Sequence, residues 1–252
     1  MLALVIGGSG GIGAALVQRL LETAHITRVV ATWHTKPPPE SESNVEPGSD
    51  HLVWMQLDAS DPVSVERFAQ QLSDNISARS PGLPVSLVIN TVGLLHNQSM
   101  QPEKSLRSFD AANLATTMQV NCLPTLLLAQ ALAALLKSSE PAVFASVSAR
   151  VGSISDNHLG GWYSYRISKA ALNMAIRTLS VEWARSHRNV CVAALHPGTT
   201  ATALSEPFQT NVPADKLFDA DTTADYLLQV VASLDASKSG RFWAFDGSEI
   251  PW

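Results

Sequence analysis

Short apolar runs alternate with helical patterns along the whole chain. The predicted strands cover residues 2–6, 27–33, 51–57, 85–89, 142–147, 190–195 and 241–245. Helical periodicity is seen over 14–21, 105–137 and 221–234, and a further helix is expected to carry Tyr165. This alternation predicts an α/β protein: a single domain, 1–252, built on one doubly wound parallel sheet (a Rossmann fold) with helices on both faces.

Local residues place several boundaries. Asp61 precedes Pro62, which is favoured at the first position of a helix, so Asp61 is expected to cap the helix that follows. Either Asp221 or Thr222 is expected to cap the last helix. Residues 36–50 are rich in Pro, Ser and Glu and lack apolar periodicity, so they predict a surface loop in place of a helix.

Composition narrows the functional class. The 252 residues are 46% hydrophobic and 15% charged with a net charge of -5, which argues against a nucleic-acid partner. Cys122 and Cys191 are too few for a disulfide framework, so a reducing compartment is the simpler expectation. The apolar N-terminal run ends in glycines too soon for a signal peptide. Residues 123–136 fall short of the roughly 20 that span a bilayer. We therefore expect a cytoplasmic protein without a membrane or nucleic-acid partner.

The first predicted strand ends in a glycine-rich turn that leads into a helix. Glycines allow the backbone to approach a pyrophosphate, and the free N–H groups and dipole of a helix N-terminus favour its negative charge. A plain flexible turn is the alternative, but the position between strand and helix favours a cofactor site. The candidate phosphate-binding residues are Gly7, Ser9, Gly11, Ile12 and Gly13.

Tyr165 and Lys169 are one helical turn apart, so their side chains should leave the same helix face. A free phenol has a pKa of about 10, and a neighbouring cation pulls that value toward neutrality. The pair is a candidate general acid and base. By itself, the same spacing also describes an ordinary exposed helix face.

The spacing Gly7-x-x-x-Gly11-x-Gly13, together with Tyr165 and Lys169, resembles the short-chain dehydrogenase/reductase family over nearly the whole chain. The insertion 153–161 and the run from Arg150 to Arg166 are similar to its C-signal and sniffer-like carbonyl reductase branch. One departure is Ile6, where the family often has Thr. The resemblance implies a catalytic role for Asn121 in a proton relay.

The resemblance also implies a catalytic serine at the end of the strand 142–147. Gly152 aligns Ser148 with the first serine of the family's Ser-Ser-x-x-Gly pattern and Ala149 with the second, which is the active one. Ser148 is our prediction, with Ser146 and Ser153 as alternatives. Tyr163 is a rival for Tyr165, but only Tyr165 has a lysine four residues later.

Cofactor choice depends on the end of the second strand. A carboxylate there would bind a ribose 2′-hydroxyl and repel a 2′-phosphate. This chain instead has Thr32, His34 and Lys36, with no acidic residue before Glu40, so we predict NADP (NADPH) rather than NAD. We predict no metal site. The resemblance implies further cofactor contacts, at Asp58, Asn90, Gly93, Lys169, Pro197, Gly198, Thr200 and Thr202.

Together these features predict an NADP-dependent oxidoreductase that reduces an aldehyde, ketone or quinone, with a substrate lid at about 199–214. Its Ala203–Ala214 part contains Pro207 and Phe208 but no obvious charged anchor. Alternatives are an NAD-linked alcohol dehydrogenase, an acyl ketoreductase, or an NADP-binding signalling or sensing protein with little turnover. By resemblance, the helices with Asn121 and Tyr165 should form a homodimer or homotetramer interface.

Overall fold

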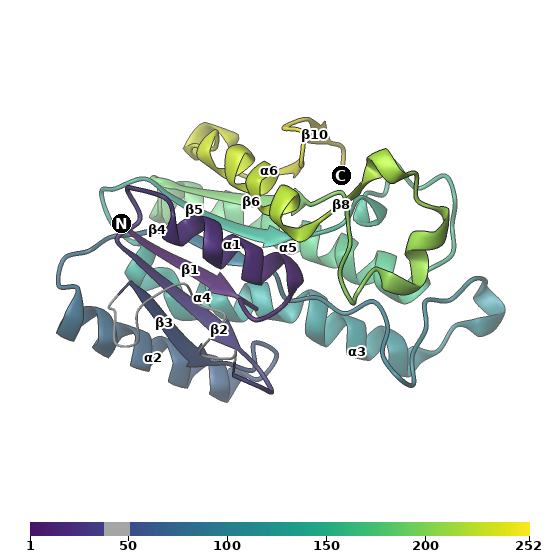
Figure 1. Ribbon diagram of the computed structural model, residues 1–252, viewed down its shortest axis with the longest axis horizontal. Helices are drawn as coiled ribbons and strands as arrows, with labels where there is room; N and C mark the ends of the chain where they lie inside the picture. The colour runs from purple at the N-terminus through teal and green to yellow at the C-terminus, as the bar shows by residue number, and fades with distance from the viewer. Residues whose placement is uncertain (38–50) are drawn as a thin grey trace.

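The computed structural model describes residues 1–37 and 51–252. An eight-stranded sheet forms its centre, and the helices lie around it (Figure 1). The strand order is β10-β9-β6-β5-β4-β1-β2-β3, and every pair is parallel except β9 with β10. The strands are β1 (Leu2–Ile6), β2 (Arg28–Trp33), β3 (Leu52–Gln56), β4 (Val85–Asn90), β5 (Ala142–Val147), β6 (Val190–His196), β9 (Arg241–Ala244) and β10 (Glu249–Ile250). Strands β1, β2 and β3 follow one another toward one edge of the sheet, and β4, β5, β6, β9 and β10 follow one another toward the other edge. The direction therefore reverses between β1 and β4. Ligands bind at such a switch point in sheets of this kind.

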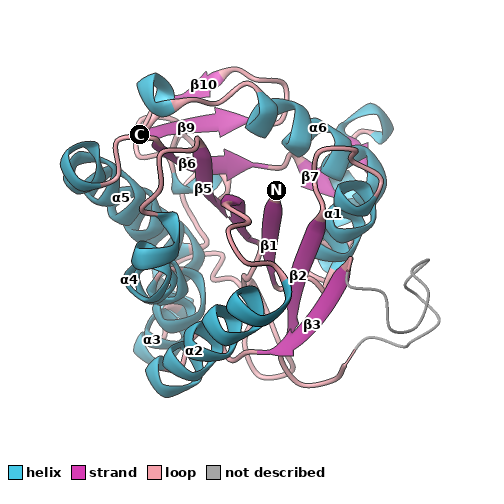
Figure 2. Cartoon of the chain, turned by 90° about the vertical axis from the view of Figure 1, so that its left-hand side faces the viewer, coloured by secondary structure: helices cyan, strands magenta, loops and turns pink. Residues whose placement is uncertain are grey.

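Helices cover both faces of the sheet, as predicted (Figure 2). One face carries α1 (Gly11–Leu21) and α6 (Ala220–Ala232), which pack against each other. The other carries α2 (Pro62–Arg79), α4 (Leu123–Leu136) and α5 (Tyr163–Ser186), and α3 (Ala111–Asn121) packs against α5.

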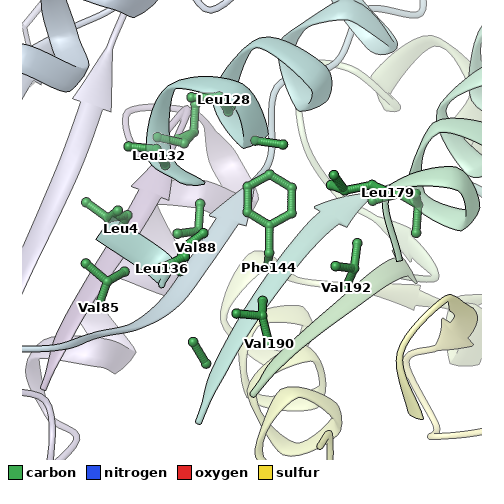
Figure 3. Close-up of a cluster of buried hydrophobic side chains, with 14 of the residues drawn as sticks. Leu4, Val85, Val88, Leu128, Leu132, Leu136, Phe144, Leu179, Val190 and Val192 are labelled. Carbon is green, nitrogen blue, oxygen red and sulfur yellow. The ribbon is translucent and has the colours of Figure 1, made fainter. Parts of the chain in front are cut away.

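The two faces have separate apolar cores because side chains alternate along each strand. In β1, Leu2, Leu4 and Ile6 belong to the core under α2, α4 and α5, whereas Ala3 and Val5 belong to the core under α1 and α6. The first core contains large side chains such as Phe144 (Figure 3). The Phe144 ring meets that of Trp183 edge-on, with 5.5 Å between the ring centres.

The helical region expected at 105–137 is divided in the structure. It contains a short 3-10 turn, η2 (Leu106–Ser108), then α3 and α4, which meet at Cys122. Pro124 stands in the first turn of α4, where its missing N–H does not interrupt a helical hydrogen bond. By length and composition alone, 111–136 could cross a membrane, but 44% of the 18-residue apolar window within it is buried inside the protein.

Capping was predicted correctly for one helix and wrongly for another. Asp61 caps α2 by accepting hydrogen bonds from the N–H groups of Val63 and Ser64, both at 3.2 Å. The cap of α6 is Asp219, which accepts from Thr222 N at 2.7 Å, rather than Asp221 or Thr222. Asp219 has the extended backbone that a cap requires, whereas Asp221 and Thr222 lie inside the helix.

Other differences are local. Helix α1 begins at Gly11, three residues earlier than predicted, because the glycines continue into its first turn. The antiparallel strand β10 was not predicted. Most of the predicted loop 36–50 lies outside the described residues. Between β6 and α6, the chain forms β7 (Thr199–Thr200), the 3-10 turns η4 (Glu206–Asn211) and η5 (Ala214–Lys216), and β8 (Leu217–Phe218), which pairs with β7.

Candidate active site

A cavity of about 540 Å³ opens at the carboxyl ends of β1, β4, β5 and β6. This is the size range of pockets that bind small molecules and cofactors. The glycine turn forms one part of its wall, the start of α5 another, and the segment after β6 a third. The predicted site residues that line it are Gly7, Gly11, Ile12, Gly13, Gly93, Ser148, Tyr165, Lys169, Pro197, Gly198, Thr200 and Thr202.

The glycine turn has the shape that a cofactor phosphate needs. Gly7 is in the left-handed region with φ +82, and a Cβ on Gly13 would stand 2.2 Å from the carbonyl oxygen of Gly7. Gly10 precedes α1 and provides no capping side chain, so the first turn of the helix presents its N–H groups to the cavity. A pyrophosphate therefore fits this turn. Ser9 is exposed and does not line the cavity.

Tyr165 and Lys169 both face the cavity from the first two turns of α5. The Lys169 Nζ lies 5.8 Å from the centre of the Tyr165 ring and donates a hydrogen bond to the carbonyl oxygen of Val147 at 2.9 Å. Burial lowers the pKa of Lys169 from 10.5 to about 8.

The pKa of Tyr165 moves in the direction opposite to our expectation. Burial raises it above its usual value of 10 because the surrounding protein disfavours the phenolate. The nearby ammonium does not offset this effect. A raised pKa keeps the phenol protonated at neutral pH, which is the form that can donate a proton.

Asn121 ends α3 behind the cavity wall. Its Oδ1 accepts from Leu94 N at 2.6 Å, while its Nδ2 donates to Leu94 O and to Ser168 Oγ, both at 2.9 Å. These bonds tie the loop after β4 to α5 and satisfy the buried amide. A proton-relay role for Asn121 stays a prediction.

The three candidate serines have different surroundings. Ser148 lines the cavity, and its hydroxyl donates to Asn173 Oδ1 at 2.7 Å. Ser146 exchanges a hydrogen bond with Thr125 at 2.9 Å, and Ser153 donates to the carbonyl oxygen of Pro251 at 2.6 Å. Of the three, Ser148 is the one on the cavity wall, next to Ala149.

The predicted 2′-phosphate residues Thr32, His34 and Lys36 do not line the cavity. The Thr32 hydroxyl is buried and accepts from Gly7 N at 2.9 Å, so it braces the turn. His34 and Lys36 are exposed, and His34 Nε2 lies 3.5 Å from Asp58 Oδ2. Partial burial acts to raise the pKa of Asp58, but hydrogen bonds from Ser60 and the nearby His34 outweigh it and lower the value.

The remaining predicted contacts support loops around the site. Asn90 is buried, donates to Thr125 Oγ1 at 3.2 Å and accepts from Val92 N at 3.1 Å. Gly198 has φ +76, and a Cβ there would meet the Phe218 ring at 2.7 Å. Thr200 shares a hydrogen bond of 2.9 Å with Thr223.

An aromatic wall beside Tyr165 was not predicted from the sequence. The Trp162 ring lies 6.2 Å from that of Tyr165 and 5.0 Å from that of Phe208, and both Trp162 and Phe208 line the cavity. His96 meets Phe208 at 5.7 Å, and its Nε2 lies 3.1 Å from the carbonyl oxygen of Leu204. The rival Tyr163 packs against Phe109 instead. The paired glycines before Trp162 were the available signal of an unusual backbone.

Comparison with known proteins agrees with this geometry. Residues 1–213 match the family described as short chain dehydrogenase. The C-signal protein of Myxococcus xanthus is 34% identical over 169 residues, covering 67% of this chain and 93% of that protein. A 1-hydroxy-2-glutathionyl-2-methyl-3-butene dehydrogenase of Rhodococcus sp. (strain AD45) is 29% identical, covering 99% of this chain and 98% of that protein.

Two solved structures show the same fold. The NADPH-bound carbonyl reductase from chicken fatty liver has a TM-score of 0.85 and 25% identity, covering 100% of this chain and 94% of that one. The carbonyl reductase Sniffer of D. melanogaster has a TM-score of 0.84 and 21% identity, covering 99% of this chain and 98% of that one. With the glycine turn, Tyr165 and Lys169 around one cavity, these matches establish that the chain belongs to the short-chain dehydrogenase/reductase family of NAD(P)-dependent oxidoreductases.

Proposed function

We propose that this protein is an NADP-dependent carbonyl reductase in which Tyr165 is the general acid. The observation that carries the proposal is that one cavity is lined both by a glycine turn suited to a phosphate and by the buried phenol of Tyr165, whose raised pKa keeps it protonated. The NADPH-bound relative from chicken fatty liver supports the choice of reaction and cofactor.

The chain's residues would divide the work as follows. The turn from Gly7 to Gly13 and the N-terminus of α1 hold the pyrophosphate, and Lys169 holds the nicotinamide ribose hydroxyls with the N–H groups not used by Val147. The bound nicotinamide supplies the hydride to the carbonyl carbon. Tyr165 hydrogen-bonds the carbonyl oxygen and donates its proton as that oxygen becomes an alkoxide. Trp162 and Phe208 exclude water from one side of the reacting group.

Ser148 is the second proposed contact to the carbonyl oxygen. Its proton is directed at Asn173 in this structure, so binding the substrate requires the hydroxyl to rotate. The hydrogen bond between Ser148 and Asn173 is the observation that favours the second candidate function. That candidate is a sensing or signalling protein that binds NADP and turns over slowly. The similarity to C-signal is compatible with it.

The remaining parts of the proposal concern the whole molecule. Residues 1–252 act as one catalytic domain with a lid at about 199–214, in a cytoplasmic homodimer or homotetramer. Exposed apolar side chains on the outer faces of α4 and α5 support self-association; they are Leu126, Ile167, Met174 and Val181.

The direct test is oxidation of NADPH and NADH in the presence of a panel of aldehydes, ketones and quinones, with binding titrations of both cofactors. NADPH-dependent turnover supports the reductase. Tight NADPH binding without turnover on any carbonyl supports the sensing protein. A clear preference for NADH in both assays supports an NAD-linked dehydrogenase.

Lys36→Ala should weaken NADPH binding selectively. An exposed lysine that contacts the 2′-phosphate contributes about 1.4 kcal/mol, so we expect a roughly tenfold higher Kd for NADPH. The Kd for NADH should not change, because NADH lacks that phosphate. Lys137→Ala, at the exposed end of α4, is the matched control. Equal effects on both cofactors, or none, would contradict the NADP assignment.

The pH dependence should follow Lys169. Because burial lowers its pKa to about 8, raising the pH through that value removes the positive charge from the free enzyme. We expect log kcat/KM for carbonyl reduction to fall with a slope approaching one per pH unit above about 8. Titration of Tyr165 cannot cause this fall, since burial raises its pKa. A flat profile up to pH 9.5, with NADPH binding intact, would contradict a role for the charged lysine.

A further inference from the structure

The backbone before α5 adopts an unusual conformation. Trp162 is the one non-glycine among the described residues with positive φ, at φ 51 and ψ 44. Gly160 and Gly161 precede it with φ 64 and 67. A left-handed conformation is unfavourable for a residue with a bulky side chain, so other contacts must hold it there.

Glu103 supplies those contacts from a different part of the chain. It lies 61 residues before Ser164, between β4 and α3, and is only 3% exposed. Its backbone carbonyl accepts the N–H of Trp162 at 2.5 Å. One carboxylate oxygen accepts Ser164 N at 3.1 Å and the other accepts the Ser164 hydroxyl. Trp162 and Ser164, which flank Tyr163, are therefore both hydrogen-bonded to Glu103.

The carboxylate also suits the electrostatics of the helix start. Helix α5 has 24 residues, no acidic residue in its first turn and no side-chain cap from Trp162. A negative charge at this end interacts favourably with the helix dipole and accepts an N–H that would otherwise lack a partner. Glu103 thus takes the place of the missing cap.

The first turn of α5 is also where the active site begins. Trp162 forms the aromatic wall with Phe208, and Tyr165 lies one residue beyond Ser164. Any shift in the first turn moves both the wall and the acid. A displacement of about 1 Å in a reacting group can reduce a rate about a hundredfold.

We propose that the Glu103 side chain is a positioning group of the active site: through its two hydrogen bonds to Ser164 it fixes the first turn of α5, and thereby the orientation of Trp162 and the placement of Tyr165. The inference rests on the proposed reductase function for its kinetic consequence. Its structural consequence is independent of turnover, because the environment of the Trp162 indole reports it directly.

The test compares Glu103→Ala and Glu103→Gln with wild type. Alanine removes both carboxylate contacts and should lower kcat/KM for carbonyl reduction by about 30- to 100-fold, while the Kd for NADPH changes less than about twofold. Glutamine can accept the Ser164 N–H with its oxygen and donate to the Ser164 hydroxyl with its NH2 group. It should therefore restore kcat/KM to within about fivefold of wild type. Glu182→Ala, an exposed glutamate farther along α5, is the matched control.

Acrylamide quenching of tryptophan fluorescence gives the second readout. The Trp162 contribution is the difference between each protein and the same protein with Trp162→Phe. Glu103→Ala should make that contribution more accessible, and Glu103→Gln should not. If the alanine variant does not fold, Glu103→Asp replaces it, since the shorter side chain keeps the charge but withdraws from Ser164.

The outcomes separate the two proposals. Wild type that turns over no carbonyl overturns the reductase, and the quenching data alone then decide whether Glu103 positions Trp162. Unchanged kcat/KM and unchanged Trp162 quenching in Glu103→Ala overturn the positioning role. Equal losses in the alanine and glutamine variants also overturn it, because hydrogen bonding to Ser164 would not be the cause.

Discussion

Tyr165→Phe is expected to lower kcat for carbonyl reduction by about a thousandfold, because the substitution removes only the acidic hydroxyl of a general acid. The aromatic ring remains, so its contact with Trp162 and the surrounding core should be kept. The Kd for NADPH should change little, since the glycine turn and Lys169 hold the cofactor. Single-turnover oxidation of NADPH, monitored at a saturating carbonyl concentration, measures the loss.

Tyr163→Phe provides the matched control for this prediction. It removes a hydroxyl from the same helix turn, but Tyr163 packs against Phe109 and does not line the cavity. We expect kcat within about twofold of wild type, as for a substitution away from the reacting groups. A Tyr165→Phe protein with wild-type kcat, or a larger loss in Tyr163→Phe, would exclude Tyr165 as the acid.

Gly13→Ala is expected to abolish measurable NADPH binding and to destabilise the fold. The added Cβ would lie 2.2 Å from Gly7 O, 2.9 Å from Gly7 C and 2.9 Å from the Thr91 hydroxyl. Two of these atoms are backbone, so the turn must open to relieve the overlap. Overpacking of this kind costs about 3 kcal/mol, which thermal or urea unfolding would detect alongside the cofactor titration.

Gly10→Ala tests whether the effect comes from this close approach. At Gly10 the nearest atom to an added Cβ is 3.6 Å away, which is an ordinary contact, and φ is negative. Replacing this glycine cap by alanine should cost about 0.5–1 kcal/mol, well below the loss expected at Gly13. If both alanine variants bind NADPH equally well, the tight packing of the turn is not what shapes the cofactor site.

Local patterns were sufficient to predict most of the framework and part of the site. The strands, the glycine turn and the pair Tyr165 and Lys169 depend on residues close together in sequence, so periodicity and spacing reveal them. The cap of α2 was found in the same way. The cap of α6 was not, because Asp219, Asp221 and Thr222 all have capping side chains and only the backbone conformation distinguishes them.

Contacts between distant segments could not be predicted from spacing. Glu103 reaches Ser164 across 61 residues, and His96 reaches the carbonyl oxygen of Leu204 across 108. The pKa of Tyr165 was misjudged for the same reason: helical spacing reveals the nearby lysine but not the burial that outweighs it. Electrostatics at a site depend on how completely the fold removes water, which a one-dimensional pattern does not record.

The alternation along β1 has a consequence for the depth of the cofactor site. On the side of α1 and α6, the core contains Ala31 of β2 as well as Ala3 of β1. The glycine turn packs closely on this side: a Cβ on Gly8 would stand 2.9 Å from that of Ala31 and 3.2 Å from the Trp54 ring. The small side chain of Ala31 therefore leaves the room in which the glycine turn packs against the sheet. Enlarging Ala31 would raise the floor of that site, a change felt by the cofactor without any alteration of the residues that touch it.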